Sequence, residues 1–191
     1  MQLNTVGDLM IPLSECPKVS TDATLEEVFL VLDEAQRSSP IGRPHLRVVL
    51  VVDQQGLVVG KLGYLALLRG LEPRYDLFGD LELLARAGVS QELVGSMLEQ
   101  FRFWRGSLED IAGRAASIKV SSVMHPIEDY LEHNASIAHG LHRLIMSQTL
   151  SLLVKDGSTV VGLFRLAELF TELTAQVRHT KSAKLEEERR P

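Results

Sequence analysis

The chain has 191 residues, of which 45% are hydrophobic and 24% are charged, and its net charge is −5. This composition excludes a disordered chain and supplies enough apolar side chains for a sizeable core. The negative charge argues against a general nucleic-acid-binding or anionic-membrane surface, because both need clustered Lys and Arg. We therefore expect neither nucleic acid nor a membrane as a partner.

The single cysteine, Cys16, excludes an internal disulfide and is typical of a reducing compartment. The N-terminal residues lack the basic start and apolar run of a signal peptide. No apolar stretch reaches the roughly 18 residues that span a bilayer. We expect a cytoplasmic location.

The first part of the chain predicts a helix followed by two strands. A short motif, Val6-x-Asp8-Leu9-Met10-x-Pro12, comes first. Thr24 and Glu27 then form the capping box of a helix over residues 25–37. The apolar run 48–52 predicts a buried strand, which a turn joins to a second strand over residues 57–62. A short helix follows.

The same order of features returns after residue 119. The motif recurs as Val120-x-Ser122-Val123-Met124-x-Pro126, and Ser136 predicts the start of a helix over residues 137–147. Strands over residues 150–154 and 159–164 follow, joined by a turn at Asp156-Gly157. The sequence is thus an internal repeat of strand, helix, strand, strand and helix. One copy alone would leave half of its sheet uncovered, so we expect the copies to pack around a shared core.

This doubled pattern resembles the cystathionine-β-synthase (CBS) domain, which occurs in tandem as a Bateman module. The resemblance covers about residues 5–71 and 119–173. It implies an α+β fold of two β-α-β-β-α units related by a pseudo-two-fold axis and usually dimerised. It also implies a regulatory module, not an enzyme, that binds an adenosine-containing ligand in clefts between the units and signals to a partner by conformational change.

The resemblance also sets the expected domain boundaries. Residues 1–71 form the first repeat, residues 72–118 a helical insertion, residues 119–178 the second repeat, and residues 179–191 a charged tail that extends a helix or frays.

Nucleotide-binding CBS members end each repeat with Gly-x-x-Thr-x-x-Asp, where the hydroxyl contacts phosphate and the carboxylate binds the ribose hydroxyls. The first copy has Gly63 and Ala66 at the Thr and Asp positions, so both polar groups are missing. The second copy has Arg165 and Glu168 there. The resemblance therefore places a ligand in the second copy, with Glu168 on ribose and Arg165 on phosphate.

Other positions fall where family members line the pocket. Tyr130 is expected to stack on adenine or, equally, to pack at a strand edge. The remaining candidates are polar: His125 and Thr149 as pocket residues, and Arg47 and Lys61 either as phosphate contacts or as solvated surface cations. The candidate regulatory ligands are AMP, ADP, ATP, NAD and S-adenosylmethionine, and no cofactor is required. The alternative function is a structural or protein-interaction CBS module that has lost its ligand.

The insertion carries leucines and aromatics at helical spacing. Phe101, Phe103 and Trp104 lie beside two arginines and form a candidate hot spot for a partner protein; alternatively, they cover the protein's own core or seal a homodimer. We expect a homodimer, because two-fold association is the commonest closed symmetry and the insertion and final helices offer surplus apolar surface.

Motifs for catalysis and metal binding are missing from the sequence. No nucleophile stands in a recognisable motif with a base, so we expect no catalytic residues. His139 and His142 share one helix face, but a zinc site needs at least three protein ligands and only His133 is a further candidate. We expect no metal.

Overall fold

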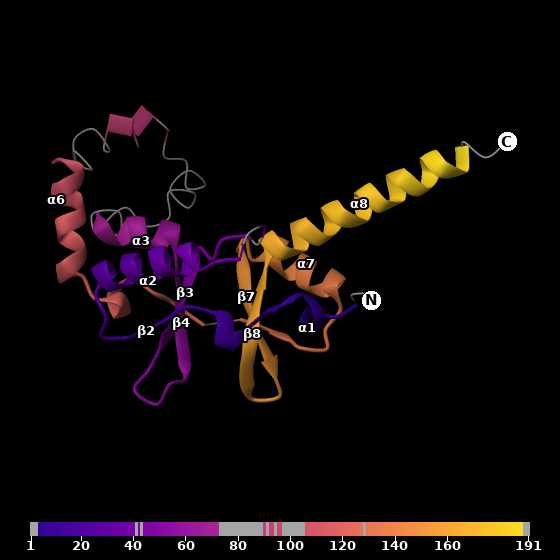
Figure 1. The fold of residues 1–191 in the computed structure, drawn as a ribbon. Helices are drawn as coiled ribbons and strands as arrows, with labels where there is room; N and C mark the ends of the chain where they lie inside the picture. The colour runs from indigo at the N-terminus through magenta and orange to yellow at the C-terminus, as the bar shows by residue number, and fades with distance from the viewer. Residues whose placement is uncertain are drawn as a thin grey trace. The chain divides into compact units, whose positions relative to one another are not determined.

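The computed structural model describes residues 4–40, 42, 44–72, 90, 92–93, 95–96, 106–127 and 129–188. The chain divides into two compact units, each built on a four-stranded sheet (Figure 1). Unit 1 comprises Met1–Cys16, Pro40–Pro44 and Ile127–Pro191, and unit 2 comprises Pro17–Ser39 and His45–Pro126. The fold is mixed α+β, as the sequence predicts.

Unit 2 holds the helix and strands of the first sequence copy. Its sheet has the order β2-β3-β4-β5, in which β2 is parallel to β3 and the other pairs are antiparallel. Its elements are β2 (Lys18–Ser20), α2 (Leu25–Arg37), β3 (Val48–Val52), β4 (Val58–Gly63), α3 (Tyr64–Leu71), α6 (Leu108–Gly113), η3 (Arg114–Ser117), η4 (Val120–Ser122) and β5 (His125–Pro126).

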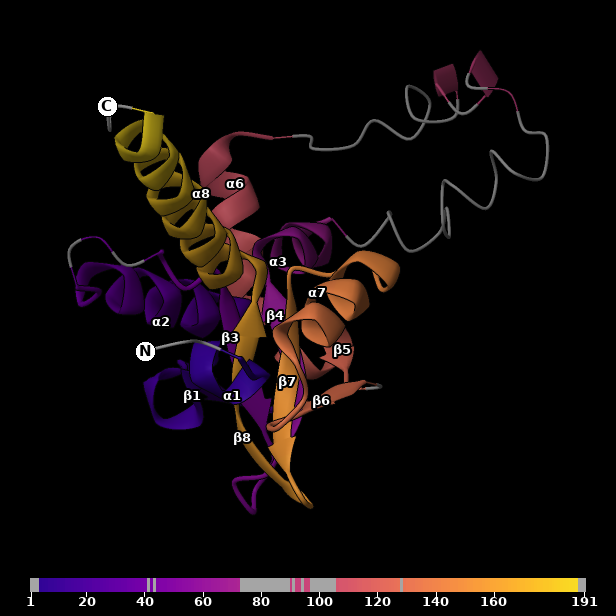
Figure 2. The same ribbon diagram turned by 90° about the vertical axis from the view of Figure 1, so that its right-hand side faces the viewer.

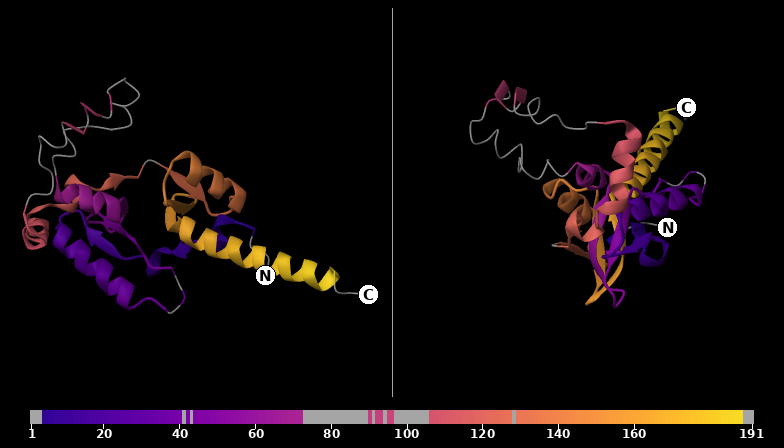
Figure 3. Two further views of the ribbon diagram at one scale, coloured as in Figure 1. Left: turned by 90° about the horizontal axis from the view of Figure 1, so that it is seen from above. Right: turned by 90° about the vertical axis from the view of Figure 1, so that its left-hand side faces the viewer.

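Unit 1 repeats this arrangement with the second copy. Its sheet has the order β1-β8-β7-β6, with β6 parallel to β7. The last helix, α8, continues well beyond α7 (Figures 2 and 3). The elements of unit 1 are α1 (Val6–Leu9), β1 (Ile11–Pro12), η1 (Leu13–Glu15), β6 (Tyr130–Glu132), α7 (Ile137–Met146), β7 (Ser151–Asp156), β8 (Thr159–Arg165) and α8 (Leu166–Glu188).

The two sequence copies exchange their short Met-x-Pro strands. Pro12 of β1 lies opposite Gly162 of β8, and Pro126 of β5 lies opposite Gly60 of β4. Each sheet therefore receives its edge strand from the other sequence copy. A Cβ on Gly162 would lie 2.5 Å from the carbonyl oxygen of Ile11, so only glycine permits this approach. The predicted boundaries at residues 71 and 119 follow the sequence copies, whereas the compact units follow this exchange.

The core of unit 2 forms where the sequence places its apolar face. In α2, Leu25, Val28 and Leu32 are buried against β3 and β4, whereas Phe29 is 39% exposed. The predicted capping box begins this helix: the Glu27 N–H donates to Thr24 Oγ1 over 3.3 Å, and the Thr24 N–H donates to Glu27 Oε2 over 2.6 Å. The bounds of α2 and β3 agree with the prediction from sequence.

The described end of the insertion, residues 106–118, packs against the core of unit 2. Ala115 is buried in its core, and Ile111 and Ile118 pack against that core. Arg114 Nη1 donates to the carbonyl of Leu71 over 3.2 Å and lies 3.5 Å from the buried Glu72 carboxylate. Arg114, near the end of the insertion, is thus tied to the end of α3.

Most of the insertion lies outside the described residues, including Phe101, Phe103 and Trp104. The helices expected there and the partner hot spot remain predictions. At the C-terminus, α8 runs to Glu188, so the charged segment continues a helix. In the described part of the chain, no helix is both long and apolar enough to cross a membrane.

The N-terminal helix α1 is fixed by backbone hydrogen bonds to the second copy. The Val6 N–H donates to the carbonyl of Ala135 over 2.7 Å, and the Gly7 N–H donates to that of His133 over 2.9 Å. The Asp8 carboxylate accepts from the backbone N–H groups of Thr5 and Asn4 at 2.9 and 3.0 Å. These bonds to Thr5 and Asn4 lower the pKa of Asp8 from its ordinary value of 3.8.

Asp8 should contribute to stability in a pH-dependent way. Because its pKa is lower in the folded than in the unfolded protein, the contribution is present above pH 3.8 and is lost as the pH falls through the folded pKa. Asp8→Asn should therefore flatten the acid limb of the stability curve measured by urea denaturation. Asp156→Asn, at the exposed end of β7, is the control. Identical acid limbs for Asp8→Asn and the wild type would contradict this expectation.

Candidate functional site

The candidate site lies where β8 ends and α8 begins. Arg165 is the last residue of β8 and is buried, and Glu168 lies in the first turn of α8. The Leu166 N–H donates to the carbonyl of Leu150 over 3.0 Å, which continues the pairing with β7 past the strand end. Phe164, fully buried in the core of unit 1, anchors the preceding position. The backbone that carries both charged residues is therefore fixed from two sides.

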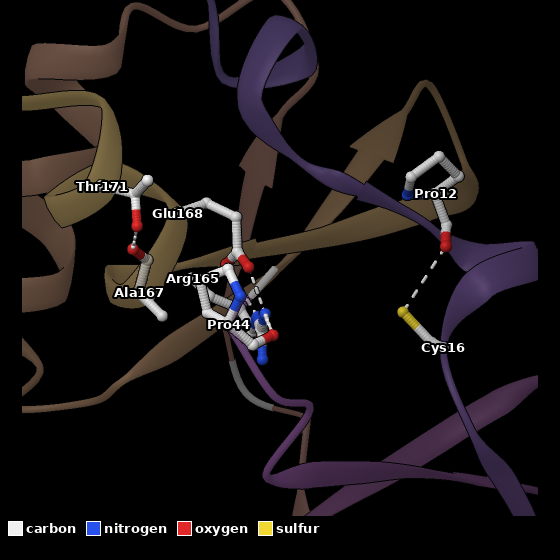
Figure 4. A network of polar contacts seen from close by, with 7 residues as sticks. All are labelled: Pro12, Cys16, Pro44, Arg165, Ala167, Glu168 and Thr171. Atoms are coloured by element: carbon white, nitrogen blue, oxygen red, sulfur yellow. Dashed lines mark hydrogen bonds and ion pairs between the residues drawn. The ribbon is translucent and has the colours of Figure 1, made fainter. Parts of the chain in front are cut away.

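Arg165 and Glu168 form a partly buried ion pair (Figure 4). Arg165 Nε donates to Glu168 Oε2 over 2.8 Å, and Arg165 Nη2 donates to Glu168 Oε1. The two side chains are 6% and 17% exposed. Two parallel charge-assisted bonds are the geometry in which Arg holds a carboxylate most firmly. The sequence predicts two separate ligand contacts, and the structure joins them to each other.

The same guanidinium also holds a segment of the first copy. Arg165 Nη2 donates to the carbonyl of Pro44 over 3.2 Å, at the end of Pro40–Pro44, which we call the strap (Figure 4). The strap belongs to unit 1, although α2 before it and β3 after it belong to unit 2. Gly42 has a φ of 89°, which favours glycine in this connection. The sequence gives no signal for the Pro44 contact, because a backbone carbonyl is present at every residue.

Thr149 lies beside this junction. The chain leaves α7 through Gln148, whose φ is 47°, and the Thr149 N–H donates to the carbonyl of Leu144 over 3.1 Å. This is a helix end of the Schellman type. Thr149 Oγ1 donates to the carbonyl of Ser151 over 3.1 Å, and Ser151 is the strand partner of Arg165. The structure therefore brings Thr149 to the end of the strand pair that carries Arg165.

Tyr130 lies on β6, on the other side of β7, where it pairs with Leu153. The Nζ atom of Lys155 lies 3.3 Å from the centroid of the Tyr130 ring, a cation–π contact. One face of the ring is thus covered by a cation. Sequence reasoning missed Lys155, because the parallel pairing of residues 130–132 with 153–155 is not encoded locally.

The remaining predicted residues lie in unit 2. Lys61 on β4 is the strand partner of His125 on β5, and Arg47 is exposed just before β3. At the β4–α3 junction, Gly63 caps the helix without a side chain and Ala66 is buried in the core. The structure thus places Tyr130, Thr149, Arg165 and Glu168 in unit 1 and Arg47, Lys61 and His125 in unit 2.

The described residues include no group of three or more His, Cys, Asp or Glu side chains that could hold a metal ion. His139 and His142 are exposed on α7. The Cys16 thiol is buried and donates to the carbonyl of Pro12 over 3.5 Å.

No family model matches the sequence, and neither does any curated protein. Solved structures match it closely in fold. The CBS-pair protein CBSX2 from Arabidopsis thaliana superposes with a TM-score of 0.60 and 15% identity over 93% of this chain and 99% of that chain. CBSX2 in complex with AMP gives a TM-score of 0.56 and 15% identity, over 90% of this chain and 97% of that chain.

The cytosolic domain of the Mg²⁺ channel MgtE in complex with ATP gives a TM-score of 0.52 and 17% identity, over 88% of this chain and 48% of that chain. The chain has the fold of a tandem CBS pair.

Proposed function

We propose that the chain is a regulatory module that binds an adenosine-containing nucleotide at the β8–α8 junction of unit 1, and that it is not an enzyme. Glu168 is the observation that carries this proposal. Its carboxylate is 17% exposed and held in place at the position where CBS members bind ribose. Supporting the ligand class, CBSX2 has been solved with AMP and the MgtE domain with ATP.

The carboxylate retains acceptor capacity in its ion pair. An ionised carboxylate has about four lone-pair sites, and the bonds from Arg165 occupy one on each oxygen. Each oxygen can therefore still accept a hydrogen bond from one hydroxyl of a ribose. Thr149 and Tyr130 complete the proposed set of contacts in unit 1.

The first copy is proposed to contribute less. Gly63 and Ala66 supply no polar side chain at the corresponding junction. Arg47, Lys61 and His125 remain proposed contacts, with the two cations as partners for phosphate. Ligand binding would then favour one conformation of the module and signal it to a partner protein. AMP, ADP, ATP, NAD and S-adenosylmethionine are the ligands to compare.

A structural module without a ligand is the second candidate. It is favoured by the ion pair itself, because Arg165 and Glu168 satisfy each other without a ligand. A thermal-shift panel with the five ligands separates the two functions. A ligand at 100 times its dissociation constant should add about 2.7 kcal/mol of stability, whereas a flat response across the panel favours the structural module.

Glu168→Gln should weaken AMP binding by about tenfold to a hundredfold, because hydrogen bonds to a charged acceptor contribute about 1.5 to 3 kcal/mol. The substitution keeps the length of the side chain and removes its charge. Titration calorimetry gives the affinity. The matched control is Glu172→Gln, one turn further along α8, where the carboxylate accepts from Gln176 Nε2 over 2.7 Å. This control should bind AMP as the wild type does.

Lys61→Ala distinguishes the two copies. If Lys61→Ala abolishes AMP binding while Glu168→Gln leaves it intact, the nucleotide binds at the first copy and the assignment to the second is wrong.

A further inference from the structure

Arg165 stands where nucleotide-binding CBS members carry a hydroxyl, and the sequence predicts that it contacts phosphate. Its observed contacts point elsewhere. Nε and Nη2 donate to the two oxygens of Glu168, and Nη2 also donates to the carbonyl of Pro44. A guanidinium paired with a carboxylate forms a group of zero net charge. Its attraction for a distant phosphate is much weaker than that of an unpaired cation.

These contacts fix the position of the Glu168 carboxylate. An unrestrained Glu side chain loses conformational entropy when a ligand orders it. Two parallel bonds from Arg165 order the carboxylate before any ligand arrives, and such preorganisation increases affinity and selectivity. A pair of ribose hydroxyls would meet two acceptor oxygens that are already oriented.

The contact with Pro44 adds a second consequence. Arg165 is 6% exposed, and a hydrogen bond shielded from water is electrostatically stronger than an exposed one. One side chain of the second copy therefore holds both the proposed ribose acceptor and the strap, which comes from the α2–β3 connection of the first copy. A change in the Arg165–Glu168 pair would therefore alter the hydrogen bond between Arg165 and the strap.

We propose that Arg165 is a positioning residue: it orients Glu168 and anchors the strap, so that the site selects a ligand by its ribose cis-diol and not by its phosphate. The selectivity part rests on the proposed function, and the anchoring part does not. A simple phosphate contact would be made by the charge of Arg165, whereas positioning requires its planar fork of donors.

Titration calorimetry with adenosine, 2′-deoxyadenosine and AMP tests the selectivity. We expect the wild type to prefer adenosine over 2′-deoxyadenosine, and both Arg165→Met and Arg165→Lys to reduce this preference about tenfold. Arg165→Lys keeps the charge but cannot make two parallel bonds to one carboxylate. The ratio of AMP to adenosine affinity should stay as in the wild type. Loss of the AMP preference in Arg165→Met, with the diol preference intact, would overturn the proposal.

Hydrogen exchange of the ligand-free protein tests the anchoring. In both variants the amides of residues 45–47, next to the strap, should exchange about tenfold faster than in the wild type. The amides of the turn around Gly56 are the internal reference. If the wild type binds none of the three compounds, the proposed function fails, and this measurement still decides the role of Arg165. Unchanged exchange at residues 45–47 would show that Arg165 does not anchor the strap.

Discussion

Glu168→Ala is expected to lower the free energy of unfolding by about 3 kcal/mol, because it removes the carboxylate that pairs with the buried guanidinium of Arg165. Arg165 is 6% exposed, and its bonds to Glu168 neutralise it in the folded protein. Loss of a carboxylate partner is far more costly for a buried cation than for an exposed one, since water cannot replace the lost interaction. Urea denaturation followed by circular dichroism measures the effect.

The double variant Arg165→Met/Glu168→Leu should be much more stable than Glu168→Ala, within about 1 kcal/mol of the wild type. Replacing both charges removes the desolvation cost as well as the attraction. A double variant that is this stable and binds no nucleotide would indicate that the pair is retained for ligand binding and contributes little to folding. Glu172→Ala, at a half-buried position one turn along α8, is the control for loss of a carboxylate. If Glu168→Ala costs no more than Glu172→Ala, the pair is not buried in solution.

Gly162→Ala is expected to destabilise the protein by about 3 kcal/mol, at the upper end of what overpacking costs. The added Cβ would lie 2.5 Å from the carbonyl oxygen of Ile11 and 2.6 Å from Sδ of Met10. The carbonyl belongs to the backbone of β1, so it cannot move without disturbing the pairing of β1 with β8. Thermal and urea unfolding measure the loss.

The internal repeat supplies matched controls for this substitution. At Gly60 the nearest atom to an added Cβ is Sδ of Met124 at 2.7 Å, and a flexible side chain can move aside, so Gly60→Ala should cost about 1 kcal/mol. At Gly63 the nearest atom is the carbonyl oxygen of Arg47 at 3.7 Å, an ordinary contact. Gly63→Ala should therefore be close to neutral. Equal losses at Gly60, Gly63 and Gly162 would show that helix or strand propensity, and not the edge strand, determines the effect.

The exchanged strands also explain why a glycine stands at the same place in both copies, at Gly60 and Gly162. Each glycine receives the Met-x-Pro strand of the other copy: Gly162 receives Ile11–Pro12 and Gly60 receives His125–Pro126. A cut between the copies after residue 118 would remove an edge strand from both sheets. Each sheet thus depends on both copies, even though each copy reads as a complete unit in the sequence.

The sequence by itself determined the local elements and the repeat. The helix over Leu25–Arg37 and the strand over Val48–Val52 agree with prediction, because a capping box and a continuous apolar run act over a few residues. The α+β fold of a tandem CBS pair could likewise be predicted, because the same elements recur in the same order. The nucleotide contacts, the homodimer and the partner surface remain predictions.

The tertiary structure alone decided which charged groups meet. Arg165 and Pro44 are separated by 121 residues, and Tyr130 reaches Lys155 only through the pairing of β6 with β7. Contacts of this kind depend on strand order and on the path of connections, which no local pattern specifies. The sequence could identify Arg165 and Glu168 as candidates, but the contact of Arg165 with Pro44 depended on the fold.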